Sequence, residues 1–260
     1  MNIRLEVLIS AMYQTDMSKF EDTAVSSDAL LINQCENNSY VEIEKDGSHF
    51  RMISTTERGL SRSRNMALAN AKGDYCLICD DDELLYEGYT EKIECAYQKY
   101  PDADIICFKV IFQGKTYSPK AYRIGFLRAL RVSSVQMCLK LKSIKKAMVS
   151  FDVNFGSGTP VGSGEENIFL YDCLKKGLKV YYVPIVIGEV SQIESKWFKG
   201  FSEDYFIHRG QIIYRLMKNI GFFYCLYFSL TKYRLYKSNM SRKKAFFLML
   251  KGMREQYKAK

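Results

Sequence analysis

The stretch Tyr75-Cys76-Leu77-Ile78-Cys79-Asp80-Asp81-Asp82 decides the fold. Its apolar part, from Tyr75 to Cys79, predicts a strand that is buried on both faces of a sheet. The three aspartates follow this strand directly. In open α/β sheets, ligands bind at the carboxyl ends of the strands. The stretch therefore predicts an α/β fold with a polar site at Asp80-Asp81-Asp82.

On both sides of this stretch, short apolar runs alternate with helical patterns. The order strand–helix–strand repeats along the first half of the chain, which favours a mainly parallel sheet flanked by helices. A helix after residue 60 is expected to be capped by Ser61, and Pro184 is expected to end a late strand. The predicted strands are 5–10, 29–33, 41–44, 50–53, 75–79, 103–112, 135–139 and 179–183, and the predicted helices are 16–25, 62–71, 87–100 and 165–176.

The net charge of +9 is concentrated near the carboxyl terminus of the 260-residue chain. Residues 1–196 hold 24 Lys and Arg against 26 Asp and Glu, whereas residues 197–260 hold 14 against 3, so the two net charges are −2 and +11. A partner that binds through basic residues must therefore bind the last quarter of the chain. The length is enough for one sizeable domain with an appendage.

The amino terminus begins with a short strand pattern and not with the apolar core of an export signal. The eight cysteines are therefore expected to be reduced thiols in a cytosolic setting. Cys76 and Cys79 form a C-x-x-C spacing, but no second cysteine pair or nearby histidine completes a zinc site. Core packing is the favoured interpretation of this pair. With only His49 and His208, the sequence gives no support for a Ser-His or Cys-His nucleophile.

Asp80-Asp81-Asp82-Glu83 places four carboxylates in a row. Such groups repel one another where solvation is poor, and a divalent cation relieves that repulsion. Oxygen ligands favour Mg²⁺ or Mn²⁺, and Mg²⁺ is often held by one or two carboxylates together with substrate phosphates. The alternative is a solvated turn or a helix amino terminus, where acidic residues are also favourable.

A basic segment, Arg58-Gly59-Leu60-Ser61-Arg62-Ser63-Arg64-Asn65, precedes the acidic one. Helix amino termini and arginine side chains both bind phosphate, so this segment is a candidate phosphate site. The alternative is a helix with a solvated basic face. A phosphate-type site and a metal-type site on either side of one helix–strand unit favour the functional interpretation.

These segments resemble the core of family 2 glycosyltransferases with the GT-A fold, a Rossmann-like sheet flanked by helices. The resemblance rests on 57–65, 71–75 and 79–82, and on a later motif over 164–170 and 175–184. It covers roughly residues 3–190 and points to the type that makes bacterial capsular or surface polysaccharide. It implies a catalytic domain over 1–195, with a nucleotide-sugar-binding half, 1–112, and an acceptor-side half, 113–195.

The resemblance also implies roles for single residues. Asp82 and Asp80 would bind Mn²⁺ or Mg²⁺, and Glu166 would be the general base of an inverting transfer, with Glu165 the other candidate. The family commonly has Asp at the base position. It also has a Pro and an Asn near the end of the first strand and an Asp after the second, where this chain differs. The implied contacts to the nucleotide-sugar donor are Ser10, Asn33, Arg58, Arg64, Asp80 and Asp81.

Residues 196–260 are predicted to form a basic, aromatic, helical extension. Residues 219–231 carry no charge and are bounded by Lys218 and Lys232. This run is shorter than the about 20 residues that span a bilayer as a helix. A basic amphipathic segment instead favours the surface of an anionic membrane, and the alternative is a helix packed on the catalytic domain. No nucleic-acid-binding motif accompanies these basic residues, so no nucleic-acid partner is expected.

The expected function is transfer of a sugar, from a UDP-sugar, to a saccharide acceptor that is linked to a lipid. The enzyme would be cytoplasmic and peripheral on the inner face of the cell membrane. Two alternatives stay open. A nucleotidyltransferase acting on a sugar phosphate would also use carboxylate-bound Mg²⁺, and a catalytically inactive membrane-associated adaptor would retain the fold without the activity.

Overall fold

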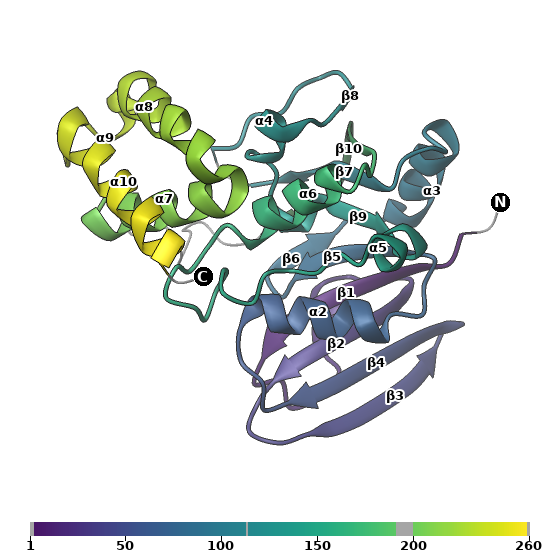
Figure 1. Ribbon diagram of the computed structural model, residues 1–260. Coiled ribbons are helices and arrows are strands. Elements are labelled where there is room, and N and C mark those ends of the chain that lie inside the picture. Colours follow the sequence, from purple (N-terminus) through teal and green to yellow (C-terminus); the bar gives the residue numbers. More distant parts are fainter. Residues whose placement is uncertain (1–2, 113, 191–199, 259–260) are drawn as a thin grey trace. The chain divides into compact units, whose positions relative to one another are not determined.

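The computed structural model describes residues 3–112, 114–190 and 200–258. The chain divides into two compact units, the first formed by Met1–Thr159 with Glu165–Glu194 and the second by Pro160–Gly164 with Ser195–Lys260. The described strands all belong to the first unit (Figure 1). The predicted functional halves, 1–112 and 113–195, and the separate role of 196–260 remain predictions.

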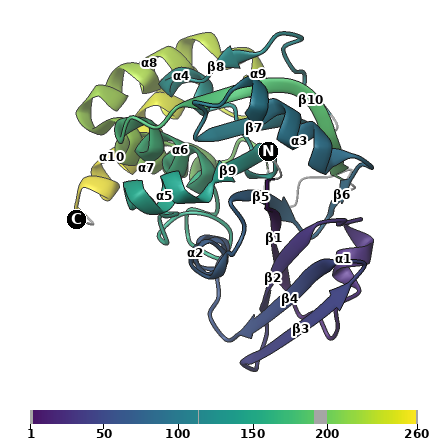
Figure 2. The ribbon, with the colours of Figure 1, turned by 90° about the vertical axis from the view of Figure 1, so that its right-hand side faces the viewer.

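Four parallel strands form one side of the sheet, in the order β4 (Ser48–Thr55), β2 (Asp28–Gln34), β1 (Leu5–Met12) and β5 (Tyr75–Asp80) (Figure 2). In the register of β1 and β5, Ser10 lies opposite Asp80. Because these strands are parallel, their carboxyl ends meet at one edge, and the polar residues that follow the apolar runs collect there.

The other side of the sheet mixes strand directions. Strand β9 (Met137–Lys140) lies antiparallel between β5 and β7 (Ile105–Ile111), and β10 (Val180–Val190) is parallel to β7. The short strands β6 (Glu83–Leu85) and β8 (Tyr122–Arg123) pair antiparallel with β10. At the opposite edge of the sheet, β3 (Ser39–Lys45) pairs antiparallel with β4. Strands β1, β2, β4, β5, β7 and β10 all run in one direction, which confirms the predicted α/β class.

Helices cover the sheet of the first unit. Helix α2 (Leu60–Asn70) packs against β1 and β2, and α3 (Tyr89–Lys99) packs against β10. The remaining helical elements of the unit are α1 (Lys19–Asp22), α4 (Phe126–Ala129), η1 (Ser134–Gln136), α5 (Leu141–Ala147) and α6 (Glu165–Lys175).

Three of the differences from the sequence prediction have a clear local cause. Pro184 does not end the last strand, because β10 bulges between Tyr182 and Val186 and the proline falls in the irregular stretch. Helix α1 is only four residues long, since the left-handed Ala24 (φ 52°) stops it soon after it starts. Ser61 is not a cap, because α2 begins at Leu60, two residues before the predicted start, and Gly59 occupies the cap position.

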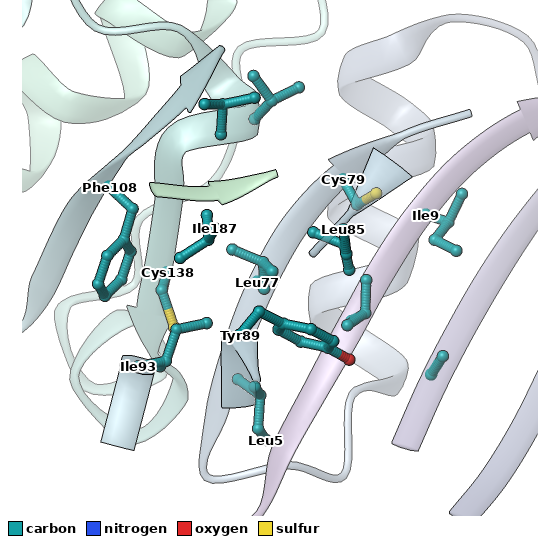
Figure 3. Packing of buried hydrophobic residues seen from close by; sticks show 14 of the residues in the cluster. Leu5, Ile9, Leu77, Cys79, Leu85, Tyr89, Ile93, Phe108, Cys138 and Ile187 are labelled. Carbon is teal, nitrogen blue, oxygen red and sulfur yellow. The ribbon is translucent and has the colours of Figure 1, made fainter. Parts of the chain in front are cut away.

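The core of the first unit lies between the sheet and its helices. Figure 3 shows Leu77 and Cys79 of β5 among Ile9, Tyr89 and other buried residues. Cys76 and Cys79 are free thiols with no exposed surface. Burial raises the pKa of both thiols well above the ordinary range. The core-packing interpretation of the C-x-x-C pair is therefore confirmed.

The described part of the second unit consists of helices: α7 (Glu203–Met217), η2 (Lys218–Ile220), α8 (Gly221–Thr231), α9 (Tyr233–Tyr236) and α10 (Arg242–Lys258). Helices α7 and α10 approach closely at two glycines. A Cβ on Gly210 would lie 2.0 Å from the Met249 carbonyl oxygen, and one on Gly252 would lie 1.9 Å from that of Ile207. Over the described residues, no helix has the length and apolar character of a membrane span.

Candidate active site

The acidic run divides at the end of β5. Asp80 ends the strand with its side chain 32% exposed, Asp81 is exposed, and Asp82 is half-buried in the turn that follows. Glu83 starts β6 and is 1% exposed, and burial raises the pKa of its carboxyl well above the ordinary value. The prediction that four carboxylates cluster together is therefore wrong for Glu83. Strand β6 pairs with β10 and directs the Glu83 side chain into the interior.

Arg64 of α2 connects the acidic turn to the start of α6. Its guanidinium donates from Nη2 to Asp80 Oδ1 and Ser134 Oγ and from Nη1 to Glu165 Oε1, each at 2.8 Å. Its side chain is 2% exposed and lies over the Phe151 ring, 5.5 Å from the centroid. The Arg64 side chain therefore holds together three residues that are far apart in the sequence, Asp80, Ser134 and Glu165.

The charge of Arg64 is maintained by these carboxylates. Burial alone would lower the pKa of a guanidinium, but Asp80 and Glu165 outweigh burial and raise the pKa of Arg64 above its usual value. A buried ion pair of this kind contributes little net stability, but loss of one partner leaves an uncompensated charge. The donor contact predicted for Arg64 stays a prediction, and the geometry adds a positioning role.

The amino terminus of α2 is closed by protein groups. The Gly59 N–H donates to Gln34 Oε1 at 2.7 Å, and the Leu60 N–H donates to the Ser157 carbonyl oxygen at 3.0 Å. These two donors at the start of the helix are already satisfied by protein groups. The phosphate site at this helix terminus stays a prediction. Arg62 is exposed and Arg64 is buried, so the three arginines do not form one basic face.

The polar residues of α2 hold the loop that precedes α6. Ser61 Oγ donates to the Phe155 carbonyl at 2.7 Å, and the Asn65 amide bonds both backbone groups of Phe151 at 2.8 Å. Sequence analysis missed this role, although the spacing of Ser61 and Asn65 places them on one helix face. Gly156, with φ 98°, lets the loop pass Glu165: a Cβ there would lie 3.0 Å from the Glu165 carboxyl carbon.

Glu165 and Glu166 open α6 in different environments. Glu165 is 6% exposed and accepts from Arg64. Glu166 is half-buried, and burial together with the neighbouring charge of Glu165 raises the pKa of its carboxyl to about 8. A carboxyl with a pKa near the working pH is suited to proton transfer, whereas one held by an arginine is suited to positioning. This difference favours Glu166 over Glu165 as the base.

Lys115 is a site residue that sequence analysis missed. Its ammonium donates to Ser133 Oγ and to Gln136 Oε1, both at 2.7 Å. Burial lowers the pKa of Lys115 to about 8, and the negative charge of Glu166 opposes that change. Because Lys115 lies in an irregular segment, no periodicity or motif marked it in the sequence.

Ser10 and Asn33 lie at the carboxyl ends of β1 and β2, as predicted, with their side chains engaged by protein. Ser10 Oγ accepts from Ser63 Oγ at 2.8 Å. Asn33 is 1% exposed, and its amide accepts from the Gln14 N–H at 2.9 Å and donates to the Gln14 carbonyl at 2.8 Å. Asn33 therefore positions the loop after β1.

Arg58 stands at the same edge, near an exposed aromatic ring. It donates to Glu36 Oε1 at 2.9 Å, and its guanidinium lies 5.8 Å from the ring centroid of Tyr13. Tyr13 is 59% exposed and has a left-handed backbone (φ 54°). Sequence analysis did not select Tyr13, although an aromatic residue directly after the first strand was the available signal.

The residues at the acidic turn fit a cation shared with a phosphate ligand. Across the described ranges, no group of three or more His, Cys, Asp or Glu side chains is gathered for metal binding. Asp80 and Asp82 supply carboxylate oxygens only, which suits Mg²⁺ or Mn²⁺ held by one or two protein carboxylates and completed by phosphate oxygens. The donor set therefore fits a metal that binds together with its ligand.

Comparison with known proteins places this geometry in a family. The model of the family described as "Glycosyl transferase family 2" matches residues 29–159. No curated protein matches the chain at the level of sequence.

Solved structures with a similar fold include the following two. The first, residues 1-349 of TarS from S. aureus in complex with UDP-GlcNAc, has a TM-score of 0.63 and 13% identity, and the match covers 95% of this chain and 80% of that one. The second, the mannosyltransferase PcManGT from Pyrobaculum calidifontis in complex with GDP-Man and Mn²⁺, has a TM-score of 0.53 and 13% identity, with coverage of 100% and 76%. At this identity, the likeness establishes the GT-A fold alone.

Proposed function

The chain belongs to glycosyl transferase family 2, and we propose that it moves a sugar from a nucleotide-sugar, a UDP-sugar, to a saccharide acceptor with inversion at the anomeric carbon. Membership of the family confirms the resemblance found in the sequence. The observation that carries the proposal is the Arg64 bridge, since it holds the acidic turn at Asp80 and the first turn of α6 in one buried network.

The acidic turn would bind the donor. Asp80 and Asp82 would hold Mn²⁺ or Mg²⁺, which supplies positive charge that stabilises the diphosphate as it leaves. Asp81 is exposed and would contact the donor ribose or sugar. Ser10, Asn33 and Arg58 lie at the same edge and would shape the nucleotide side of the site. The donors named for the two similar structures, UDP-GlcNAc and GDP-Man, support a donor of this class.

Glu166 would act as the general base. In one displacement the acceptor hydroxyl oxygen forms a bond to the anomeric carbon while the bond from that carbon to the phosphate oxygen breaks. The hydroxyl proton passes to Glu166, and the nucleoside diphosphate leaves with the bonding electron pair. One base on the acceptor side is sufficient, and a single displacement inverts the anomeric centre.

Arg64 and Glu165 would be positioning residues. Glu165 is adjacent to Glu166 and is fixed by the 2.8 Å contact to Arg64 Nη1. The same guanidinium orients Asp80, so the spacing between the metal carboxylate and the base is set by one rigid group. Positioning of this kind is effective because small displacements of a reacting group cost large factors in rate.

The acceptor would be linked to a lipid, in the synthesis of a bacterial surface or capsular polysaccharide. The enzyme would then work at the cytoplasmic face of the cell membrane, to which residues 197–260 would bind. The net charge of +11 in that segment supports this location, because the headgroups of a cytoplasmic leaflet are negatively charged.

Calorimetric binding of UDP and GDP, with Mn²⁺ and then with EDTA, tests the donor site. We expect one nucleotide to bind only with metal, and Asp82→Asn to abolish that binding while Asp46→Asn, the same change in an exposed hairpin turn, leaves it intact. Binding by neither nucleotide would contradict the proposal and favour the inactive adaptor. Release of pyrophosphate instead of nucleoside diphosphate during turnover would favour the nucleotidyltransferase.

A further inference from the structure

Helix α8 presents an outward face that consists mainly of large apolar side chains. The exposed fractions are 41% for Phe222, 69% for Phe223, 39% for Leu226, 52% for Tyr227 and 54% for Leu230. These positions are related by steps of one, three and four residues, so they lie on one side of the helix. Large apolar side chains exposed together, and not singly, mark an interaction surface.

The opposite face of α8 is firmly packed within the second unit. Cys225 and Phe228 are buried, and the Tyr236 hydroxyl donates to the Ser229 carbonyl at 2.8 Å. Arg209 of α7 lies 4.1 Å from the ring centroid of Phe228 and donates to the Tyr224 hydroxyl at 2.7 Å. The exposed face is therefore held in a defined orientation by the buried one.

Basic residues flank this apolar face in the sequence. Helix α8 contains no charged residue; Lys218 precedes its first residue by three positions, and Lys232 follows its last residue directly. Beyond it, Arg234, Lys237 and Lys243 are exposed. The arrangement of an uncharged aromatic face within a basic segment is complementary to a surface with anionic headgroups above an apolar layer.

We propose that α8 lies in the interfacial layer of an anionic lipid bilayer, with Phe223, Tyr227 and Leu230 inserted among the acyl chains. This inference rests on the proposed function, because a lipid-linked acceptor is available only at a membrane. The helix has 11 residues and is about 16 Å long, against about 30 Å for the hydrocarbon core, so it lies along the surface. Its face offers no carboxylate or amide to a protein partner, whereas lipid requires none.

Vesicle binding by the full chain tests the proposal without donor or acceptor. We expect co-sedimentation with vesicles of phosphatidylcholine and phosphatidylglycerol, and little with phosphatidylcholine alone. The double variant Phe223→Ser, Leu230→Ser should weaken binding to the anionic vesicles at least about tenfold, because two apolar anchors are lost. Leu127→Ser, which changes an exposed leucine of the first unit, is the matched control and should bind as the parent does.

The depth to which α8 enters the bilayer distinguishes insertion among the acyl chains from electrostatic adsorption to the headgroups. Trp197 is the only tryptophan of the chain, so Trp197→Phe with Phe223→Trp provides a single reporter on α8. Lipids brominated in the acyl chains should quench its fluorescence. Absence of quenching, or undiminished vesicle binding by the double variant, would overturn the proposal. If the double variant instead converts a dimer to a monomer in light scattering, the face is an interface between copies of the chain.

The transfer reaction distinguishes this inference from the proposed function. The double variant should keep full transfer to a water-soluble acceptor and lose transfer to an acceptor embedded in vesicles. If vesicle binding is intact but the parent transfers no sugar to either acceptor, the proposed function fails while the membrane inference stands. If the parent transfers to both acceptors and the double variant does so equally, the membrane inference fails alone.

Discussion

The two units depart from ordinary burial in opposite ways. The first buries charge: the side chain of Arg64 is 2% exposed, and that of Glu165 is 8% exposed. The second exposes apolar groups, with Phe223 69% and Leu230 54% exposed. The buried charges have partners inside the molecule, whereas the exposed apolar groups leave more than half of their surface open to solvent. Buried charge in the first unit builds an internal site, whereas exposed apolar side chains in the second unit point to an external partner.

Two arginines show the same difference within single side chains. Arg64 is surrounded by carboxylates and a hydroxyl at 2.8 Å. Arg209 has aromatic partners, with Tyr224 and Tyr205 as hydroxyl acceptors at 2.7 and 3.2 Å and Phe228 beneath it. Arg64 thus organises titratable groups, whereas Arg209 stabilises the packing of a helix whose outer face remains exposed.

The largest expected effect is the loss of transfer rate when the general base, Glu166, is replaced. Glu166→Gln should lower the rate of transfer by roughly 10²–10⁴-fold, the contribution typical of a general base, and should leave metal-dependent nucleotide binding unchanged. Both quantities can be measured on one preparation by product release and calorimetry. Glu165→Gln is the matched control, with a smaller loss of rate. If Glu165→Gln abolishes transfer and Glu166→Gln does not, the two roles are exchanged.

The comparison of the two arginines predicts a difference in stability. Arg64→Met should lower the free energy of unfolding by about 3–5 kcal/mol, because Glu165 and Asp80 lose their counter-charge in a buried site. Arg209→Met should cost only about 1–2 kcal/mol, the sum of a cation–π contact and hydrogen bonds to neutral groups. Urea unfolding of both variants measures the difference. Equal losses would contradict the view that Arg64 alone compensates buried charge.

The smallest expected effect is a shift in the pH profile of kcat/KM. Glu166 accepts a proton only when ionised, and its pKa is raised to about 8, so kcat/KM should fall as the pH drops below that value. Removal of the adjacent negative charge in Glu165→Gln should lower the pKa of Glu166 and move the acidic limb to lower pH. A pH profile of kcat/KM for parent and variant checks this, and an unchanged limb would show that another group titrates.

The parts of the fold that could be read from the sequence are those set by local pattern. Continuous apolar runs marked β1, β2 and β5, and two shorter runs at 41–44 and 50–53 marked β3 and β4, which form a hairpin. The position of β9 between β5 and β7 could not be predicted, because strand order depends on which distant segments pair. The bulge around Pro184 likewise depends on pairing with β7.

For the site, the sequence by itself determined the residue types and their place at strand and helix ends. The acidic triplet after β5, the two glutamates that open α6 and the uncharged run of α8 were all visible as local composition. Only the tertiary structure decided which of these groups meet: Arg64 with Asp80 and Glu165, Gln34 with the start of α2, and Lys115 with Ser133. The physical reason is that burial, and with it pKa and partner choice, depends on contacts between residues far apart in the chain, which no local pattern encodes.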